Sequence, residues 1–334
     1  MSESSRKRAA AQDTPPDQGS GGNEIATDDA GLHRTDHDFG DDYSDGSQIV
    51  IRSQWQLFRR KFLSHKLAMS SLVFLLVVVI AAVFAEQIAP YAYDEINVIA
   101  RSTPPTFEGW HLFGTDQLGR DYFSRVIYGT RVSLQVASIV AIVTTVLGTV
   151  IGSVAGYYRG WVDAILMRLT DLIVIVPLLA VLLIAAAFLG QGQPTRIAII
   201  IALLVWPSLA RIVRGVFLGL REKEYVQAAR ACGAGDLRII ARHMLPNTIG
   251  PILVNMTLTL ASAILLEATL AFLGFGVNPP TPALGLLINE GRSSMQTQWW
   301  LVVMPGVAIV AIALAINFIG DGLRDALDPT QQEK

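Results

Sequence analysis

A single carboxylate, Glu267, interrupts the long apolar stretch Thr248–Gly274. A charged side chain at the centre of a bilayer costs about 2.5–3.5 kcal/mol, and less toward its edge, so the position needs a physical reason. The carboxylate could line a polar path and meet the amino group of a passing solute. It could instead be buried and paired with an arginine or a helix N-terminus, where it would hold the packing of the helices. Asn255 and Thr259 could likewise line a path or bond a neighbouring helix.

Charged side chains also cluster between the first two apolar stretches. They are Asp116, Arg120, Asp121 and Arg125. In one interpretation, the first three form a charged rim where an external protein docks. In the other, the set forms internal salt bridges that hold a short surface helix, and the sequence leaves both open. Farther along, the spacing of Arg168 and Asp171 predicts an ion pair on one helix face.

No pattern in the sequence indicates bond-making chemistry. The histidines are scattered, at His33, His37, His65, His111 and His243, which argues against a metal-ligand cluster. A nucleophile elbow is absent, and so is the G-x-x-x-x-G-K-[ST] phosphate loop, because no lysine follows a glycine. We therefore expect that the chain is not an enzyme, binds neither a metal nor a cofactor, and has no nucleic-acid partner.

Residues 221–247 form a charged segment, rich in small residues, between two apolar stretches. With the helical period, small or flat side chains share one narrow face, at Tyr225, Ala228, Ala229 and Cys232. Gly233 then breaks the helix, and Asp236 suits the N-cap of a second one. The second helix repeats the stripe at Leu237, Ile240, Ala241 and Met244, and Pro246 is expected to end it. Two short helices joined by a glycine hinge would form a compact knob for a soluble partner.

The composition indicates which elements position these residues. The chain has 334 residues, of which 51% are hydrophobic and 16% charged, and its mean hydropathy is +0.43. These values are typical of a multi-pass membrane protein. Because a span needs about 20 apolar residues, the sequence predicts six spans. They are Leu67–Ala85, Val132–Gly156, Leu172–Gly190, Ile197–Phe217, Thr248–Gly274 and Trp300–Ile319.

Prolines and glycines within the spans predict how the helices bend and pack. The prolines are Pro177, Pro207, Pro251 and Pro305, and each removes a backbone donor, which favours a kink. In the second span, Gly148, Gly152 and Gly156 recur every four residues. Such a row of glycines permits close contact with a neighbouring helix.

Lysine and arginine predict the orientation of the spans. With the N-terminus inside, most of these residues flank the inner ends, which places both termini and residues 221–247 in the cytoplasm. Residues 1–50 are acidic and poor in large apolar residues, which predicts a disordered cytoplasmic tail. Residues 51–131 would hold an amphipathic segment, the first span and an outer loop. Residues 132–320 would form a core of five helices, and residues 321–334 a short cytoplasmic tail.

Residues 224–247 resemble a known family motif. The pattern Gln227-Ala228-Ala229, then Gly233, then His243-Met244-Leu245-Pro246 resembles the EAA loop of ABC importer permeases. Gln227 and His243 depart from the general motif in the manner of peptide-type permeases. Two more runs, residues 113–121 and 267–277, resemble the same subfamily. The resemblance extends from Trp55 to Pro329 and is to the "C" permease of dipeptide and oligopeptide importers.

This resemblance implies a fold, a set of partners and a coupling site. The fold would be that of a MetI-like type I importer permease, an all-α integral protein of the bacterial inner or plasma membrane with six transmembrane helices. Besides membrane lipid, the partners would be a homologous second permease, two ABC ATPase subunits that hold ATP and Mg, and an extracytoplasmic substrate-binding protein or lipoprotein. The residues expected to couple to the ATPase are Glu224, Tyr225, Gln227, Ala228, Ala229, Gly233, Asp236, Leu245 and Pro246.

The cargo implied by the resemblance is a dipeptide or oligopeptide. Nickel chelates, glutathione and oligosaccharides are alternatives, because the external binding protein usually selects the cargo. A different class of protein, a stand-alone secondary transporter or channel, would favour relay carboxylates in several spans and an inverted repeat. The sequence offers one such carboxylate, Glu267, and no repeat.

Overall fold

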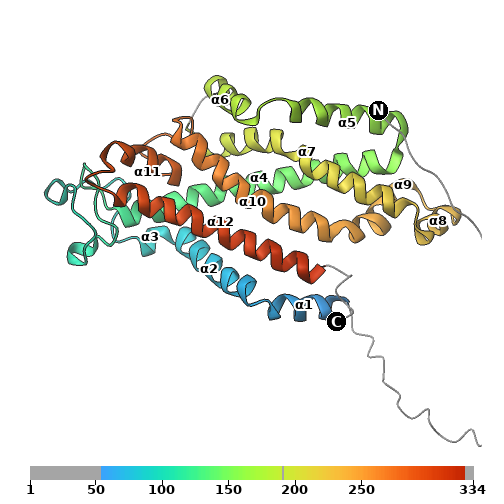
Figure 1. Ribbon diagram of the computed structural model, residues 1–334, viewed down its shortest axis with the longest axis horizontal. Helices are drawn as coiled ribbons and strands as arrows, with labels where there is room; N and C mark the ends of the chain where they lie inside the picture. The colour runs from blue at the N-terminus through green and yellow to red at the C-terminus, as the bar shows by residue number, and fades with distance from the viewer. Residues whose placement is uncertain (1–53, 190–191, 328–334) are drawn as a thin grey trace, which may run out of the picture. The chain divides into compact units, whose positions relative to one another are not determined.

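Helices dominate the part of the chain that the structure describes. The computed structural model describes residues 54–189 and 192–327, all within the unit Arg52–Lys334 (Figure 1). No β-strand occurs among these residues, although an isolated bridge joins Thr115 to Asp121. The predicted tail at residues 1–50 lies outside the described residues. The boundary predicted after residue 320 falls inside a helix that continues to Leu327.

The chain forms twelve α-helices in the described ranges. They are α1 (Gln54–Ser64), α2 (Lys66–Val83), α3 (Ala85–Ile88), α4 (Tyr122–Tyr158), α5 (Gly160–Ile175), α6 (Leu178–Leu189), α7 (Pro194–Arg221), α8 (Glu224–Ala231), α9 (Asp236–Ile239), α10 (Ile249–Phe272), α11 (Leu284–Gly291) and α12 (Trp300–Leu327). Short 3₁₀ turns lie at Val98–Ala100, Glu108–Trp110, Leu245–Thr248 and Arg292–Ser294, and a π-helical turn at Ile240–Met244.

Five helical stretches in the described residues are long and apolar enough to cross a membrane. They contain α2, α4, α7, α10 and α12, which confirms all the predicted spans except the third. The third predicted span is not one continuous helix but consists of α5 and α6, bent by 85° at the break between them, so the kink predicted at Pro177 is confirmed, and the bent pair makes a sixth span if it crosses as one. Val176 and Pro177 form the break: Pro177 lacks an N–H, and Val176 before it is extended, with φ −78° and ψ 134°.

The row of glycines in α4 confirms the predicted close contact, and its partner is α7. A Cβ atom added to Gly148 would lie 2.8 Å from the Cβ of Leu209, and one added to Gly156 would lie 2.6 Å from the Cβ of Phe217. Real Cβ atoms essentially never come that close. Glycine therefore lets the two helices approach to a distance that any larger residue would prevent.

The regions singled out in the sequence lie at opposite ends of the helices. Figure 1 shows α8 and α9 at one end, and α11 with the segment between α3 and α4 at the other. Helix α4 begins at Tyr122, so the last part of the predicted outer loop is helical. Helices α4, α7 and α10 run between these ends.

Candidate functional site

The turn between α8 and α9 has the backbone geometry that the sequence predicts. Gly233 has φ +79°, in the left-handed region that strains residues with a side chain. Its N–H donates to the carbonyl of Arg230 at 3.0 Å, and the N–H of Ala234 donates to that of Ala229 at 3.1 Å. These bonds satisfy carbonyls at the end of α8, as in other glycine-terminated helices. The predicted break between two short helices at Gly233 is confirmed.

Two local predictions in this segment were wrong. Asp236 is not the N-cap of α9, because Gly235 occupies that position, and the Asp236 carboxylate instead accepts a hydrogen bond from the Tyr157 hydroxyl at 2.6 Å. Pro246 does not end the helical path, because it lies in a 3₁₀ turn that leads directly into α10. A proline early in a helical turn removes an N–H that lacks a helical partner anyway.

Three apolar side chains attach residues 221–247 to the membrane helices. Val226 of α8, Ile239 of α9 and Met244 are fully buried. They form one core cluster with residues of α4, α7 and α10, namely Tyr157, Leu209, Val213, Phe217 and Ile252. The sequence reasoning missed Val226 and Ile239, which are large apolar residues outside the two predicted stripes.

The predicted second stripe does not face one environment. Met244 is buried and Ile240 half-buried, but Leu237 is 79% exposed and Ala241 is also exposed. The π-helical turn at Ile240–Met244 explains the difference, because its wider turn shifts the register that the 3.6-residue period assumes.

The opposite side of this segment is open to a partner. Most of the predicted coupling residues are exposed, namely Glu224, Tyr225, Gln227, Ala228, Gly233, Asp236 and Pro246, whereas Ala229 and Leu245 are half-buried. A groove of about 450 Å³ lies beside them, lined by Arg221, Glu222, Gln227, Arg230 and Ala231. The segment therefore combines a buried apolar attachment with an exposed, polar and small-residue face.

Ion pairs join α5 to α7. The Arg214 guanidinium donates to both carboxylate oxygens of Asp163, from Nε at 2.5 Å and from Nη2 at 2.6 Å. Asp171 accepts from Arg211 Nη2 at 2.8 Å, so its predicted pairing with Arg168 on the same helix was wrong. Tertiary contact places Arg211 of α7 beside Asp171, and the sequence gives no signal for that neighbour.

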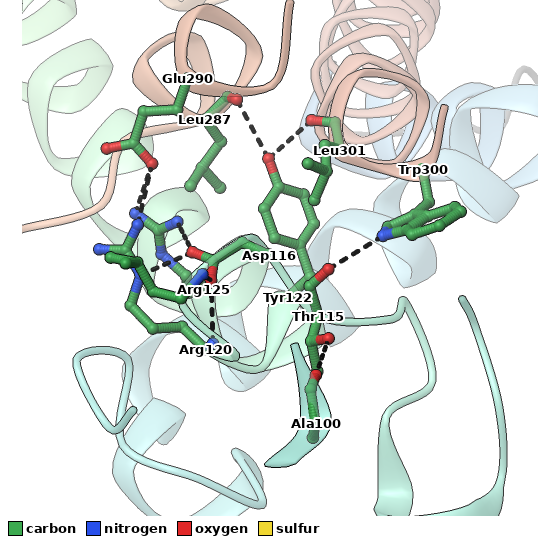
Figure 2. Close-up of polar contacts among 11 residues, drawn as sticks. Ala100, Thr115, Asp116, Arg120, Tyr122, Arg125, Leu287, Glu290, Trp300 and Leu301 are labelled. Carbon is green, nitrogen blue, oxygen red and sulfur yellow. Dashed lines mark hydrogen bonds and ion pairs between the residues drawn. The ribbon is translucent and has the colours of Figure 1, made fainter. Parts of the chain in front are cut away.

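At the other end of the helices, four charged side chains form the ion-pair cluster Asp116, Arg120, Arg125 and Glu290 (Figure 2). Asp116 Oδ2 accepts from Arg120 Nε at 2.6 Å and from Arg125 Nη1 at 3.0 Å. Glu290 Oε2 accepts from Arg125 Nη2 at 2.9 Å and from Arg120 Nη2 at 3.4 Å. Arg125 is fully buried, so the cluster ties the segment before α4 to α11 from inside the protein.

Asp121, the remaining charged residue of the predicted rim, is also buried. Its Oδ2 accepts from the Ser124 N–H at 2.7 Å and caps α4, and its Oδ1 lies 2.9 Å from His111 Nδ1. The internal interpretation therefore describes these side chains, with the difference that they hold α4 and α11 rather than a short surface helix. Docking of an external protein on Asp116, Arg120 and Asp121 stays a prediction.

Neutral hydrogen bonds extend the cluster to α12. The Tyr122 hydroxyl bonds the carbonyl oxygens of Leu301 at 2.6 Å and Leu287 at 3.1 Å, and Trp300 Nε1 donates to the Thr115 carbonyl at 3.2 Å (Figure 2). Glu290 and these aromatic contacts were missed by the sequence reasoning. Their partners lie more than a hundred residues apart along the chain, and no local spacing signals such a contact.

Glu267 is fully buried between α10 and α4. The Ser133 hydroxyl donates to Glu267 Oε2 at 2.7 Å. Among the described residues the carboxylate has no arginine partner and its Oε1 has no hydrogen bond, so the predicted pairing with an arginine or helix N-terminus was wrong. Asn255 and Thr259 contact each other within α10, at 3.4 Å between Thr259 Oγ1 and Asn255 Oδ1. Their role in a substrate path stays a prediction.

Comparison with known families shows which machinery this arrangement belongs to. Residues 148–332 match the family described as "Binding-protein-dependent transport system inner membrane component". The chain belongs to this family. Residues 53–105 match the N-terminal transmembrane domain of oligopeptide transport permease C. The resemblance of the chain to importer permeases is therefore confirmed. Coupling to an ATPase through residues 221–247 stays a prediction, and we use the name coupling loop for this segment.

Individual relatives cover almost the whole permease. A protein of Brucella abortus biovar 1, named provisionally as a peptide transport system permease protein, is 46% identical over 282 residues, or 84% of this chain and 93% of the relative. The glutathione transport system permease protein GsiD of Escherichia coli O6:K15:H31 is 39% identical over 285 residues, or 84% of this chain and 91% of that protein. The chain is thus a multi-pass, inner-membrane permease subunit of a bacterial ABC importer.

Proposed function

We propose that this permease imports dipeptides or oligopeptides, as half of a translocation path completed by a homologous second permease. Two ABC ATPase subunits and an extracytoplasmic binding protein complete the importer. The observation that carries the proposal is the coupling loop, which is attached through Val226, Ile239 and Met244 and exposes the face around Tyr225 and Ala228. Relatives named for peptide and glutathione transport support this class of cargo.

The coupling loop would act as a lever between the ATPase and the membrane helices. When ATP draws the two ATPase subunits together, a loop seated in one of them moves with it. The buried attachment passes that movement to the ends of α4, α7 and α10. The methyl groups of Ala228 and Ala229 would let the loop sit close to the backbone of its partner. ATP and Mg would be held by the partner subunits, and this chain would contribute no cofactor and no catalytic residue.

The position of the coupling loop also supports an orientation. Because ATP is cytoplasmic, α8 and α9 face the cytoplasm, and α11 with the segment between α3 and α4 faces outward. Helix α1 contacts α12, and in Figure 1 the end of α12 lies nearer to α8 and α9 than its beginning does. This arrangement, together with the lysine and arginine bias, supports cytoplasmic termini.

Glu267, Asn255 and Thr259 are proposed as polar groups beside the substrate path. In the described conformation Glu267 is bonded to Ser133 and shielded from solvent. A path contact would therefore require α10 to move relative to α4 during the transport cycle. A Ser133→Ala variant should then alter cargo uptake more than ATPase assembly.

Proteoliposomes containing the complete complex provide the test. We expect accumulation of a labelled dipeptide or tripeptide only when ATP and the binding protein are both supplied. Glutathione, a nickel chelate and an oligosaccharide, each added as a competitor, would separate the alternative cargoes. Uphill uptake by this permease alone, without any ATPase, would instead indicate a secondary transporter and overturn the proposal.

A further inference from the structure

Large apolar side chains are exposed in the segment between α3 and α4. Ile99 is 98% exposed, Phe107 is 88% exposed and Trp110 is 68% exposed. They lie in or beside the two 3₁₀ turns Val98–Ala100 and Glu108–Trp110, which we call the apolar turns. Exposed apolar side chains gathered in one segment usually mark an interaction site. Figure 1 shows this segment at the α11 end, opposite the coupling loop.

Hydrogen bonding and ring stacking tie the second apolar turn to the rest of its segment. The Tyr91 hydroxyl donates to the Gly109 carbonyl at 2.6 Å, and the Tyr91 ring stacks on the His111 ring with 5.1 Å between centroids. His111 in turn contacts the buried Asp121 carboxylate. Gly109 has φ +68° and Trp110 has φ +59°, so the chain accepts two left-handed residues to present this turn.

The first apolar turn rests on the same buried frame. The Asn97 side chain caps it by accepting from the Ile99 N–H at 3.1 Å. The Thr115 hydroxyl donates to the Ala100 carbonyl, and the Ser102 N–H donates to the Asp116 carbonyl at 3.0 Å. Because Asp116 belongs to the ion-pair cluster, the exposed turns are attached to α4 and α11. A surface that is ordered before binding loses little conformational entropy on binding.

We propose that the apolar turns are the docking surface for the extracytoplasmic binding protein, through Ile99, Phe107 and Trp110. This inference rests on the proposed function. The family's machinery depends on a binding protein, so a partner must reach the outer end of the permease. Buried aromatic residues supply most of the binding energy at many protein interfaces. The ion-pair cluster then acts as the support of the docking surface rather than as the surface itself.

Charge favours a protein partner over the membrane surface. Residues 89–110 carry three acidic side chains, Asp94, Glu95 and Glu108, against one basic side chain, Arg101, and all four are exposed. Anionic lipid headgroups would repel such a rim, whereas a binding protein with basic residues around an apolar patch would complement it. The matching surface on the binding protein should therefore be apolar with lysine or arginine at its edge.

The test uses the complete complex in nanodiscs and the binding protein that supports ATP-driven uptake by the wild-type complex. Phe107→Ser and Trp110→Ser, singly and together, should weaken binding of that protein at least tenfold for the pair. They should lower binding-protein-stimulated ATP hydrolysis and leave unstimulated hydrolysis unchanged. The matched controls Phe107→Leu and Trp110→Phe keep an apolar side chain and should bind nearly as well as wild type.

Four outcomes separate the possibilities. If the binding protein stimulates ATP hydrolysis by the wild type, and only the serine variants lose this stimulation, the result supports the apolar turns as the docking surface. If the binding protein stimulates ATP hydrolysis equally in the wild type and the serine variants, the docking surface is overturned, even when the complex imports cargo. An environment-sensitive dye can be attached at position 107 of a Phe107→Cys, Cys232→Ser variant. If the dye reports lipid contact and its signal does not change when the binding protein is added, the apolar turns contact the membrane, which also overturns the proposal. No stimulation of the wild type would count against the proposed function itself.

Discussion

The attachment of the coupling loop through Ile239 makes a quantitative prediction. Ile239 is fully buried in the cluster that joins α9 to α4 and α7. Cutting a buried isoleucine back to alanine costs about 2–5 kcal/mol, whereas Ile→Val costs about 0.5–1.5 kcal/mol. Even ~2 kcal/mol lowers the ratio of attached to detached loop about 30-fold, since each 1.4 kcal/mol is a factor of about ten.

Ile239→Ala should therefore uncouple the importer while the ATPase remains assembled. In proteoliposomes we expect the amount of cargo moved per ATP hydrolysed to fall several-fold, and the Tm of the complex to fall. Ile239→Val should show a small change in the same direction. Leu237→Ala is the matched control on the same helix, because this side chain is exposed and its loss should weaken ATPase binding without lowering the Tm of the permease.

The result that would refute this reasoning is specific. If Ile239→Ala moved cargo with the wild-type ratio and melted at the wild-type temperature, the buried cluster would not be the mechanical link. If Ile239→Ala and Leu237→Ala had the same effect, the two sides of α9 would not have the separate roles that their burial indicates.

Three further substitutions test other parts of the structure. Gly152→Val should destabilise the complex by at least about 1–3 kcal/mol through overpacking, seen as a lower Tm, while Gly215→Ala, which faces open space in α7, should not. Arg125→Met removes a buried partner from Asp116 and Glu290 and should cost about 3–5 kcal/mol. Arg131→Met breaks an exposed pair with Glu86 and should cost less than about 1 kcal/mol, so equal Tm losses would contradict the buried cluster. Gly233→Asp should preserve expression and ATPase activity but reduce uptake, because its φ of +79° strains residues with a side chain, and normal uptake would remove the hinge from the coupling role.

The amino-acid sequence by itself determined the membrane class, five continuous spans, the kink at Pro177 and the glycine turn between α8 and α9. These features depend on local properties. Apolar length decides whether a helix can span a bilayer, and the left-handed backbone at Gly233 follows from the residue type. The close helix contact at the glycine row of α4 could also be predicted from the sequence, because the spacing of the glycines repeats on one helix face.

Tertiary structure alone decided which side chains meet. Glu290 joins Arg125 across 165 positions, Asp171 pairs with α7 instead of its own helix, and Glu267 bonds a serine rather than an arginine. Pro177 predicted a kink but not its size of 85°, and the π-helical turn before α10 shifts the register by an amount that a fixed helical period cannot express. Long-range partners depend on how whole helices pack, and packing sums many weak contacts that no short stretch of sequence contains.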